Sequence, residues 1–388
     1  MLRVGQKEVD AIAKVLLSGK IFRYAKLGGQ CERFERRYAK YLGVKHVWMT
    51  SSGTTALTAA LAGVGIGPGD EVVVPACTYM ATPISVLAAG AIPIIVDVDE
   101  SITLDPKAVD AAVGPRTRAV VPVHMWGLPC DMKRILRVAK KHSLLVVEDA
   151  CQGIGGGYEG RKLGSIGHAG AFSFNYYKNM TCGEGGAVAT NDAAAAERAG
   201  CVIDCCRFYW DGRAESFRPF TSNGSRASEL EGAMMNAQLD RIDPMIRRMR
   251  REKHRVLRET ADCGLVPIRA NSPRHECGSH VMYTLPTAPQ ADEFARLVGG
   301  TVAGKTGRHV YTEWDPILDH QGGPHPALDP FKMPANRRCR KKYTKAQCSR
   351  SLDILSRTVM LGTHPDHKRP DVDALIRRIR NAARLVRP

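Results

Sequence analysis

A single lysine, Lys178, stands between an apolar run and a glycine cluster in the segment AFSFNYYKNMTCGEGGAVATND, residues 171–192. A buried structural lysine would be costly, and a solvated lysine needs no such surroundings. Ser173 precedes it by five residues, and the glycines of GEGG permit a compact turn before the expected strand AVAT. An amine in this setting could bond covalently to a carbonyl carbon. This segment alone leaves an ordinary loop lysine open as the alternative.

A carboxylate follows another apolar run, LLVVEDACQG, residues 144–153. The run predicts a buried strand that delivers Asp149 to its carboxyl end, with Gln152 three residues later. A charge beside a buried strand needs a partner, and a protonated ring nitrogen would be one. The alternative is a carboxylate that caps the helix that follows.

Two further segments offer binding groups. In MTSSGTTALTAAL, residues 49–61, a strand ends near Thr50 and a helix starts near Thr54 after a glycine, Gly53. Such a helix N-terminus holds phosphate well, although Ser-Gly-Thr is also a plain helix cap. In PACTYMATP, residues 75–83, Tyr79 follows a strand and could lie flat on a ring-shaped cofactor. A tyrosine that only packs in the fold is the alternative.

The four segments together match the needs of one cofactor. Pyridoxal phosphate requires an amine, an acid opposite its ring nitrogen, a phosphate cup and a support for its ring. The chain offers these groups in the order Gly53 and Thr54, Tyr79, Asp149, Ser173 and Lys178. The sequence therefore predicts a pyridoxal 5'-phosphate site.

The elements that must position these residues alternate between two periodicities from Val47 to about Gly200. Short β-branched runs such as EVVVPA and AIPIIVDV alternate with helical patterns such as TTALTAALAGV. This alternation predicts an α/β fold with a mostly parallel sheet covered by helices, whose strand ends gather ligands. After Asp243 the chain becomes richer in proline and polar residues. We therefore expect a large domain over residues 1–243, including N-terminal helices, and a smaller C-terminal α+β domain over residues 244–388.

Composition narrows the class of protein further. The chain has 388 residues, a formal net charge of +17 and twelve cysteines. No apolar run reaches the roughly 18 to 20 residues that span a bilayer, so we expect a cytoplasmic protein without membrane contact. No cysteine pair has the spacing of a zinc site, and no metal is expected. The basic stretches lack interleaved aromatic residues, which argues against nucleic acid as a partner and leaves a weak indication of anionic ligands.

Taken together, the motifs resemble those of the DegT/StrS group of pyridoxal-phosphate aminotransferases. The resemblance lies in SSGTTAL, GPGDEVVVPACTYMAT, VPVHMWGLPCDM, VVEDACQGIGG and FSFNYYKNMTCGEGGAVATND. It implies an aspartate-aminotransferase-like fold, that is, pyridoxal-phosphate fold type I. It covers about residues 20 to 240 well and the C-terminal part only loosely.

The resemblance also implies roles for single residues. Lys178 would bond to the cofactor and Asp149 would pair with its ring nitrogen, while Tyr79 would stack on the ring and Gln152 would lie near its hydroxyl side. The phosphate would be held by Gly53, Thr54 and Ser173. A neighbouring subunit usually adds an asparagine, so a homodimer with shared active sites is expected. Here Gly224 takes the aligned position and Asn223 lies one residue earlier.

The reaction expected from the resemblance is amino transfer from glutamate or glutamine to a keto-sugar, free or nucleotide-linked, or to a keto-cyclitol. This chemistry serves the biosynthesis of amino-sugars, aminocyclitols and antibiotics or other secondary metabolites. Three alternatives stay open: transamination of a non-sugar ketone, sugar dehydration on the same fold, and a non-catalytic basic binding protein. Tyr311, Trp314 and His325 could contact substrate or belong to the core.

Overall fold

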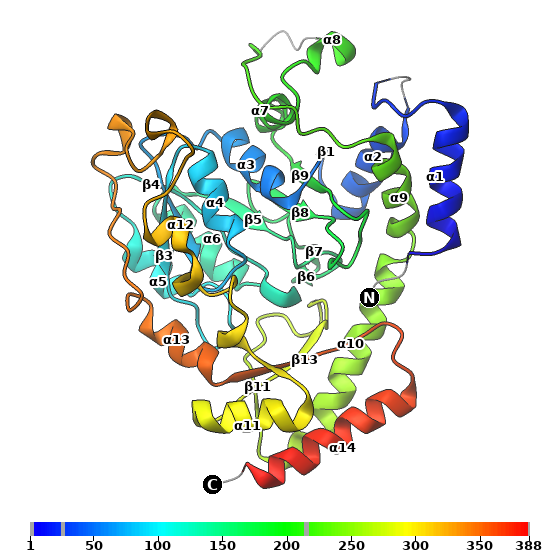
Figure 1. Cartoon of the computed structure of the whole chain (residues 1–388), viewed down its shortest axis with the longest axis vertical. Helices are drawn as coiled ribbons and strands as arrows, with labels where there is room; N and C mark the ends of the chain where they lie inside the picture. The colour runs from blue at the N-terminus through cyan, green and yellow to red at the C-terminus, as the bar shows by residue number, and fades with distance from the viewer. Residues whose placement is uncertain (1–3, 25–27, 213–216, 387–388) are drawn as a thin grey trace.

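The computed structural model describes residues 4–24, 28–212 and 217–386. Its main body is a seven-stranded sheet with helices on both faces (Figure 1). In spatial order the strands are β1 (His46–Thr50), β9 (Gly186–Thr190), β8 (Ala169–Ser173), β5 (Leu145–Asp149), β4 (Thr117–Val120), β2 (Glu71–Pro75) and β3 (Ile92–Val96).

Neighbouring strands from β8 to β3 run parallel, as the buried β-branched runs predict. The strand β9 lies between β1 and β8 and is antiparallel to both. The expected α/β class with a mostly parallel sheet is therefore confirmed. The exception, β9, is the strand that leaves the glycine turn after Lys178.

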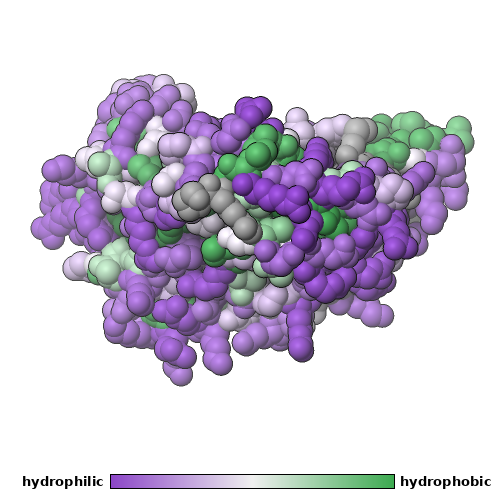
Figure 2. Space-filling model, turned by 90° about the horizontal axis from the view of Figure 1, so that it is seen from below, coloured by the Kyte–Doolittle hydropathy of each residue, from purple (hydrophilic) through white to green (hydrophobic). Residues whose placement is uncertain are grey.

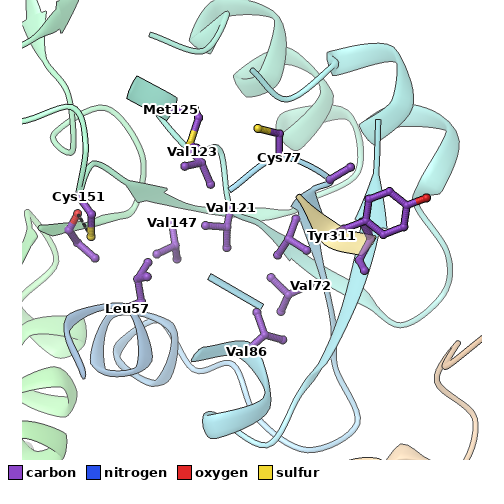
Figure 3. Close-up of a cluster of buried hydrophobic side chains, with 14 of the residues drawn as sticks. Leu57, Val72, Cys77, Val86, Val121, Val123, Met125, Val147, Cys151 and Tyr311 are labelled. Carbon is purple, nitrogen blue, oxygen red and sulfur yellow. Dashed lines mark hydrogen bonds between the residues drawn. The ribbon is translucent and has the colours of Figure 1, made fainter. Parts of the chain in front are cut away.

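Successive residues of a strand face opposite sides of the sheet, and two hydrophobic clusters result. Val72 and Val74 belong to one cluster, with helices α3 (Gly53–Gly63), α4 (Ala81–Ala88) and α7 (Ala193–Ile203). Val73 belongs to the other, with α2 (Gln30–Leu42), α5 (Pro106–Ala112), α6 (Met132–Lys141), α9 (Glu229–Leu239) and the start of α10 (Ile242–Glu259). Figure 3 shows part of the first cluster, where Leu57 of α3 and Val86 of α4 lie among strand valines.

The described helices of this body all precede residue 240. They are α1 (Gln6–Ser18), α2 (Gln30–Leu42), α3 (Gly53–Gly63), α4 (Ala81–Ala88), α5 (Pro106–Ala112), α6 (Met132–Lys141), α7 (Ala193–Ile203), α8 (Phe208–Asp211) and α9 (Glu229–Leu239). A short hairpin joins β6 (Gly157–Tyr158) to β7 (Arg161–Lys162).

A second, antiparallel sheet forms in the C-terminal part of the chain. Its strands lie in the order β10 (Val266–Pro267), β11 (His280–Thr284), β13 (Thr358–Gly362) and β12 (Thr301–Val302). Three helices share its hydrophobic cluster: α10 (Ile242–Glu259), α11 (Ala288–Val298) and α14 (Arg369–Leu385). Figure 1 shows α10 running from the main body down to this sheet.

Part of the C-terminal region packs on the main sheet instead. Tyr311, Trp314 and Ile317 belong to the same cluster as Val72, together with residues of α13 (Ser349–Ser356). The short helix α12 (Asp315–Leu318) lies in this segment. The division into domains at residues 243 and 244 stays a prediction.

The surface agrees with the composition. The face shown in Figure 2, the molecule seen from below, is mostly hydrophilic with smaller hydrophobic areas. Within the described residues, no helix is both long enough and apolar enough to span a bilayer.

Candidate active site

One cavity of about 560 Å³ gathers almost all of the residues predicted to bind a cofactor. It lies at the carboxyl ends of β1, β2, β5 and β8, where α/β sheets bind ligands. The predicted residues that line it are Gly53, Thr54, Tyr79, Asp149, Gln152, Ser173 and Lys178. Asn223 is exposed and does not line it in this single chain.

Asp149 is the last residue of β5, and 4% of its surface is exposed. Its Oδ2 accepts a hydrogen bond from Thr82 Oγ1 at 2.7 Å, and its Oδ1 accepts one from the Cys151 N–H at 3.1 Å. Both donors are neutral, and within the described ranges no basic side chain forms an ion pair with Asp149. A buried carboxylate held in this way can pair with a cation in the cavity, such as a protonated ring nitrogen.

Lys178 follows β8 in a turn closed by the hydrogen bond from its own N–H to the Asn175 carbonyl at 3.0 Å. Its side chain lines the cavity and is half-buried. The part of the chain that the structure describes places no carboxylate in an ion pair with it. The amine is thus directed toward the cavity with no internal partner of opposite charge.

The start of α3 offers groups that suit a phosphate. Ser52 caps this helix by accepting a hydrogen bond from the Thr55 N–H at 3.1 Å. Gly53 and Thr54 follow, and N–H groups in a first helical turn have no acceptor within the helix. A Cβ built on Gly53 would lie 2.6 Å from Ser173 Cβ, so only glycine allows this approach. The Ser173 hydroxyl and the helix N-terminus together suit a phosphate group.

Tyr79 and Gln152 complete the set. Tyr79 is 40% exposed, and its ring centroid lies 5.9 Å from that of His309. The Gln152 Oε1 accepts a hydrogen bond from the Trp126 N–H at 3.1 Å, which fixes the orientation of the carboxamide. An amine, a carboxylate, a helix N-terminus beside a serine hydroxyl, and an accessible aromatic ring thus line one cavity. These residues fit pyridoxal phosphate.

Several lining residues were not predicted from the sequence. They are Trp126, Ser279, His280, Arg308 and His309. Burial lowers the pKa of His280 to about 4, with a smaller contribution from the Lys253 charge. Burial also lowers the pKa of His309 to about 4, aided by the charges of Arg308 and Lys178. Both imidazoles are therefore neutral near pH 7.

Trp126 could have been predicted from the sequence, because it belongs to VPVHMWGLPCDM, one of the motifs that carry the family resemblance. It adopts a left-handed backbone conformation, with φ at 50°. The other four come from loops and a strand of the C-terminal part, where no local pattern marks them. Of the two alternatives left open for Tyr311 and Trp314, the structure supports the core, because both side chains are fully buried. His325 is exposed and lies outside the cavity.

The fold and the site define a pyridoxal-phosphate enzyme of fold type I. Residues 3–380 match the model of the DegT/DnrJ/EryC1/StrS aminotransferase family, and the chain belongs to this family. Its members depend on pyridoxal 5'-phosphate, so the predicted cofactor and the predicted fold class are confirmed.

Three known proteins illustrate the similarity. GDP-perosamine synthase of Caulobacter vibrioides is 44% identical over 215 residues, which is 54% of this chain and 56% of that protein. The L-glutamine:2-deoxy-scyllo-inosose aminotransferase of Streptoalloteichus tenebrarius is 36% identical over 286 residues, or 71% of this chain and 67% of that protein. DesV of S. venezuelae, a solved structure, matches with a TM-score of 0.75 at 30% identity and covers 97% of this chain and 94% of its own.

Proposed function

We propose that this protein transfers an amino group from an amino acid, glutamate or glutamine, to a keto-sugar or a keto-cyclitol. The observation that carries the proposal is the convergence of Lys178, Asp149, Gly53 and Ser173 on one cavity. The names of the relatives support the acceptor class, because one is a synthase of a nucleotide-linked amino-sugar and another acts on a cyclitol ketone.

When bound, pyridoxal phosphate supplies a ring that accepts electrons as a proton leaves the carbon that bears the amine. Lys178 is proposed to hold the cofactor covalently and then, once its amine is released, to move that proton as base and acid. Asp149 is proposed to keep the ring nitrogen protonated, because a carboxylate beside a cation raises the pKa of that cation.

The remaining residues are proposed to bind and orient. Gly53 and Thr54 would donate backbone N–H groups to the phosphate, with Ser173 adding its hydroxyl. Tyr79 would support one face of the ring. Gln152, oriented by its bond to the Trp126 N–H at 3.1 Å, would contact the hydroxyl side of the ring.

The test is a transfer assay with purified protein, glutamate or glutamine, and a panel of sugar, cyclitol and non-sugar ketones. Lys178→Ala should lower turnover by about 100-fold or more, since proton transfer by a positioned group is worth about that much. The matched control is Lys107→Ala, which removes an exposed lysine of α5 and should leave turnover unchanged.

Each alternative predicts a different outcome. A keto-deoxy product without amine transfer would indicate sugar dehydration. Transfer to non-sugar ketones alone would reject the acceptor class but keep the reaction type. Salt-dependent binding of nucleic acid with no bound chromophore would indicate a binding protein.

A homodimer with shared active sites is part of the proposal. Tyr177 lines the cavity although it is 77% exposed, so the cavity wall has an apolar side chain that a second chain can cover. Asn223 is proposed to reach the phosphate site of the partner. Light scattering should show a dimer, and Asn223→Ala should weaken binding of pyridoxal phosphate without changing the mass. A monomer with full activity would contradict both parts.

A cytoplasmic location is also proposed. All twelve cysteines carry free thiols, and most are buried. Thiols persist in reducing compartments, where disulfide bonds are rare.

A further inference from the structure

Residues 308–309 belong to the C-terminal part of the chain and line the cavity. Their backbone is hydrogen-bonded to residues 78–80, the segment that carries Tyr79. The Thr78 N–H donates to the His309 carbonyl at 3.0 Å, and the Met80 N–H donates to the Arg308 carbonyl at 3.2 Å. The Arg308 carbonyl also accepts a hydrogen bond from Trp314 Nε1 at 3.1 Å. Since Trp314 is fully buried, the backbone of Arg308 is fixed against the core.

The side chain of Arg308 lines the cavity from this fixed position. Its guanidinium carbon lies 5.6 Å from the centroid of the Tyr79 ring, within the range of a cation–π contact. Arg308 forms no ion pair with any of the residues described. Some arginines do pair with acids: Arg340 pairs with Glu71, and Arg350 pairs with Glu100.

The carboxylates that line the cavity do not neutralise this charge. Asp149 accepts its hydrogen bonds from Thr82 and Cys151, and Glu184 accepts one from Asn175 at 2.7 Å. The charge of Arg308 also helps to lower the pKa of its neighbour His309, after the larger effect of burial. Arg308 is exposed at the edge of the cavity, so its guanidinium is accessible to an anion that enters there.

The proposed cofactor leaves this site free, since its phosphate would be held by the N-terminus of α3 and Ser173. A guanidinium binds carboxylate or phosphate oxygens through two parallel hydrogen bonds, which fixes both position and orientation. We infer that Arg308 is a specificity-determining residue that binds an oxyanion of a substrate. Two sources share this chemistry: a carboxylate of the amino donor, and the phosphates of a nucleotide-linked acceptor. The inference rests on the proposed function.

The KM values of the two substrates separate these sources. In steady-state transfer assays, the KM of glutamate is measured at saturating ketone, and the KM of the ketone is measured at saturating glutamate. Arg308→Gln should raise the KM of one substrate roughly 10- to 100-fold, as expected for loss of a hydrogen-bonded charge, and change kcat by less than about threefold. Arg308→Lys keeps the charge but cannot donate two parallel hydrogen bonds from one plane. It should therefore bind more tightly than Arg308→Gln and less tightly than the wild type.

The matched control is Arg377→Gln, which removes the same charge from an exposed position on α14. It should leave both KM values unchanged. A higher KM for glutamate assigns Arg308 to the donor carboxylate, and a higher KM for the ketone assigns it to the acceptor phosphates. Unchanged KM values for both substrates in a folded Arg308→Gln protein would overturn the inference.

A binding measurement keeps this inference separate from the proposed function. Glutarate and GDP are titrated into the cofactor-loaded enzyme, and the cofactor absorbance is followed. Arg308→Gln should weaken the binding of one of them about tenfold or more, even if no ketone is ever aminated. Equal affinities for both probes in the wild type and the variant would overturn the inference, whereas a wild type that transfers no amine would overturn only the proposed function.

Discussion

The hydroxyl of Thr82 donates a hydrogen bond to Asp149 Oδ2 at 2.7 Å, and Thr78 Oγ1 lies 2.7 Å from the same hydroxyl. Thr82 stands in the first turn of α4, and Asp149 is the last residue of β5. All three side chains are buried. A side chain of helix α4 therefore orients the carboxylate at the end of strand β5.

Thr82→Val tests this relationship. Valine keeps the shape of threonine but removes a hydrogen bond to a charged group, which is worth about 1.5–3 kcal/mol. We expect a loss of roughly tenfold or more in kcat/KM, measured in the transfer assay. Thr260→Val is the control: it removes a buried hydroxyl of the C-terminal part that donates to the Val256 carbonyl. It should lower the melting temperature and spare kcat/KM; full activity in the Thr82 variant would show that the contact is only structural.

Gly53→Ala tests the phosphate cup. The added methyl group would lie 2.6 Å from Ser173 Cβ, so the helix start or the serine must move. Such overpacking costs about 1–3 kcal/mol, and binding of pyridoxal phosphate should weaken by roughly tenfold or more, measured by equilibrium dialysis.

The double variant Gly53→Ala/Ser173→Gly separates the steric effect of the added methyl group from the loss of the serine hydroxyl. Removing the Ser173 side chain relieves the shortest contact and leaves that with Cys151 Sγ at 3.2 Å. The melting temperature should therefore recover in large part, but the affinity should not, because the hydroxyl is gone. Gly362→Ala is the control, since a methyl group there meets no atom within 4 Å. Restored cofactor affinity in the double variant would mean that the hydroxyl does not bind phosphate.

The sequence was sufficient to predict several residues that line the cavity, where local position marks them. Lys178, Asp149 and Gly53 each follow or precede a strong strand or helix pattern, and parallel strands bring their carboxyl ends to one edge. Arg308 and Thr82 could not be found in this way. Arg308 lies in a loop that is held beside the cavity by hydrogen bonds. The backbone N–H groups of Thr78 and Met80 donate these bonds to the carbonyls of residues 309 and 308. Thr82 reads as an ordinary helix residue until the fold brings it next to Asp149.

The antiparallel direction of β9 could not be predicted from the sequence either. The run AVAT predicts a strand, and the glycines before it predict a turn. Whether that strand lies parallel or antiparallel depends on which neighbours remain free in the finished sheet. It enters between β1 and β8, antiparallel to both, and no local pattern specifies this choice.

A pH dependence of stability follows from His280. Its pKa is lowered to about 4 by burial, whereas an ordinary histidine titrates near 6.5. As pH falls below about 6.5 the unfolded chain takes up the proton first, so the folded state loses stability until about pH 4. The loss is at most about 1.4 kcal/mol per pH unit for one such group. Chemical denaturation from pH 7 to 4.5 should show a shallower decline for His280→Gln; identical slopes would contradict the assignment.

The central claim is that Lys178 bonds covalently to pyridoxal phosphate in this cavity. The most direct measurement is to load the purified protein with the cofactor, reduce it with borohydride, and locate the trapped group by mass spectrometry of peptides. We expect a phosphopyridoxyl group on Lys178, and loss of this label in Lys178→Ala but not in Lys107→Ala. A label on another lysine, or no label on a fully loaded protein, would contradict it.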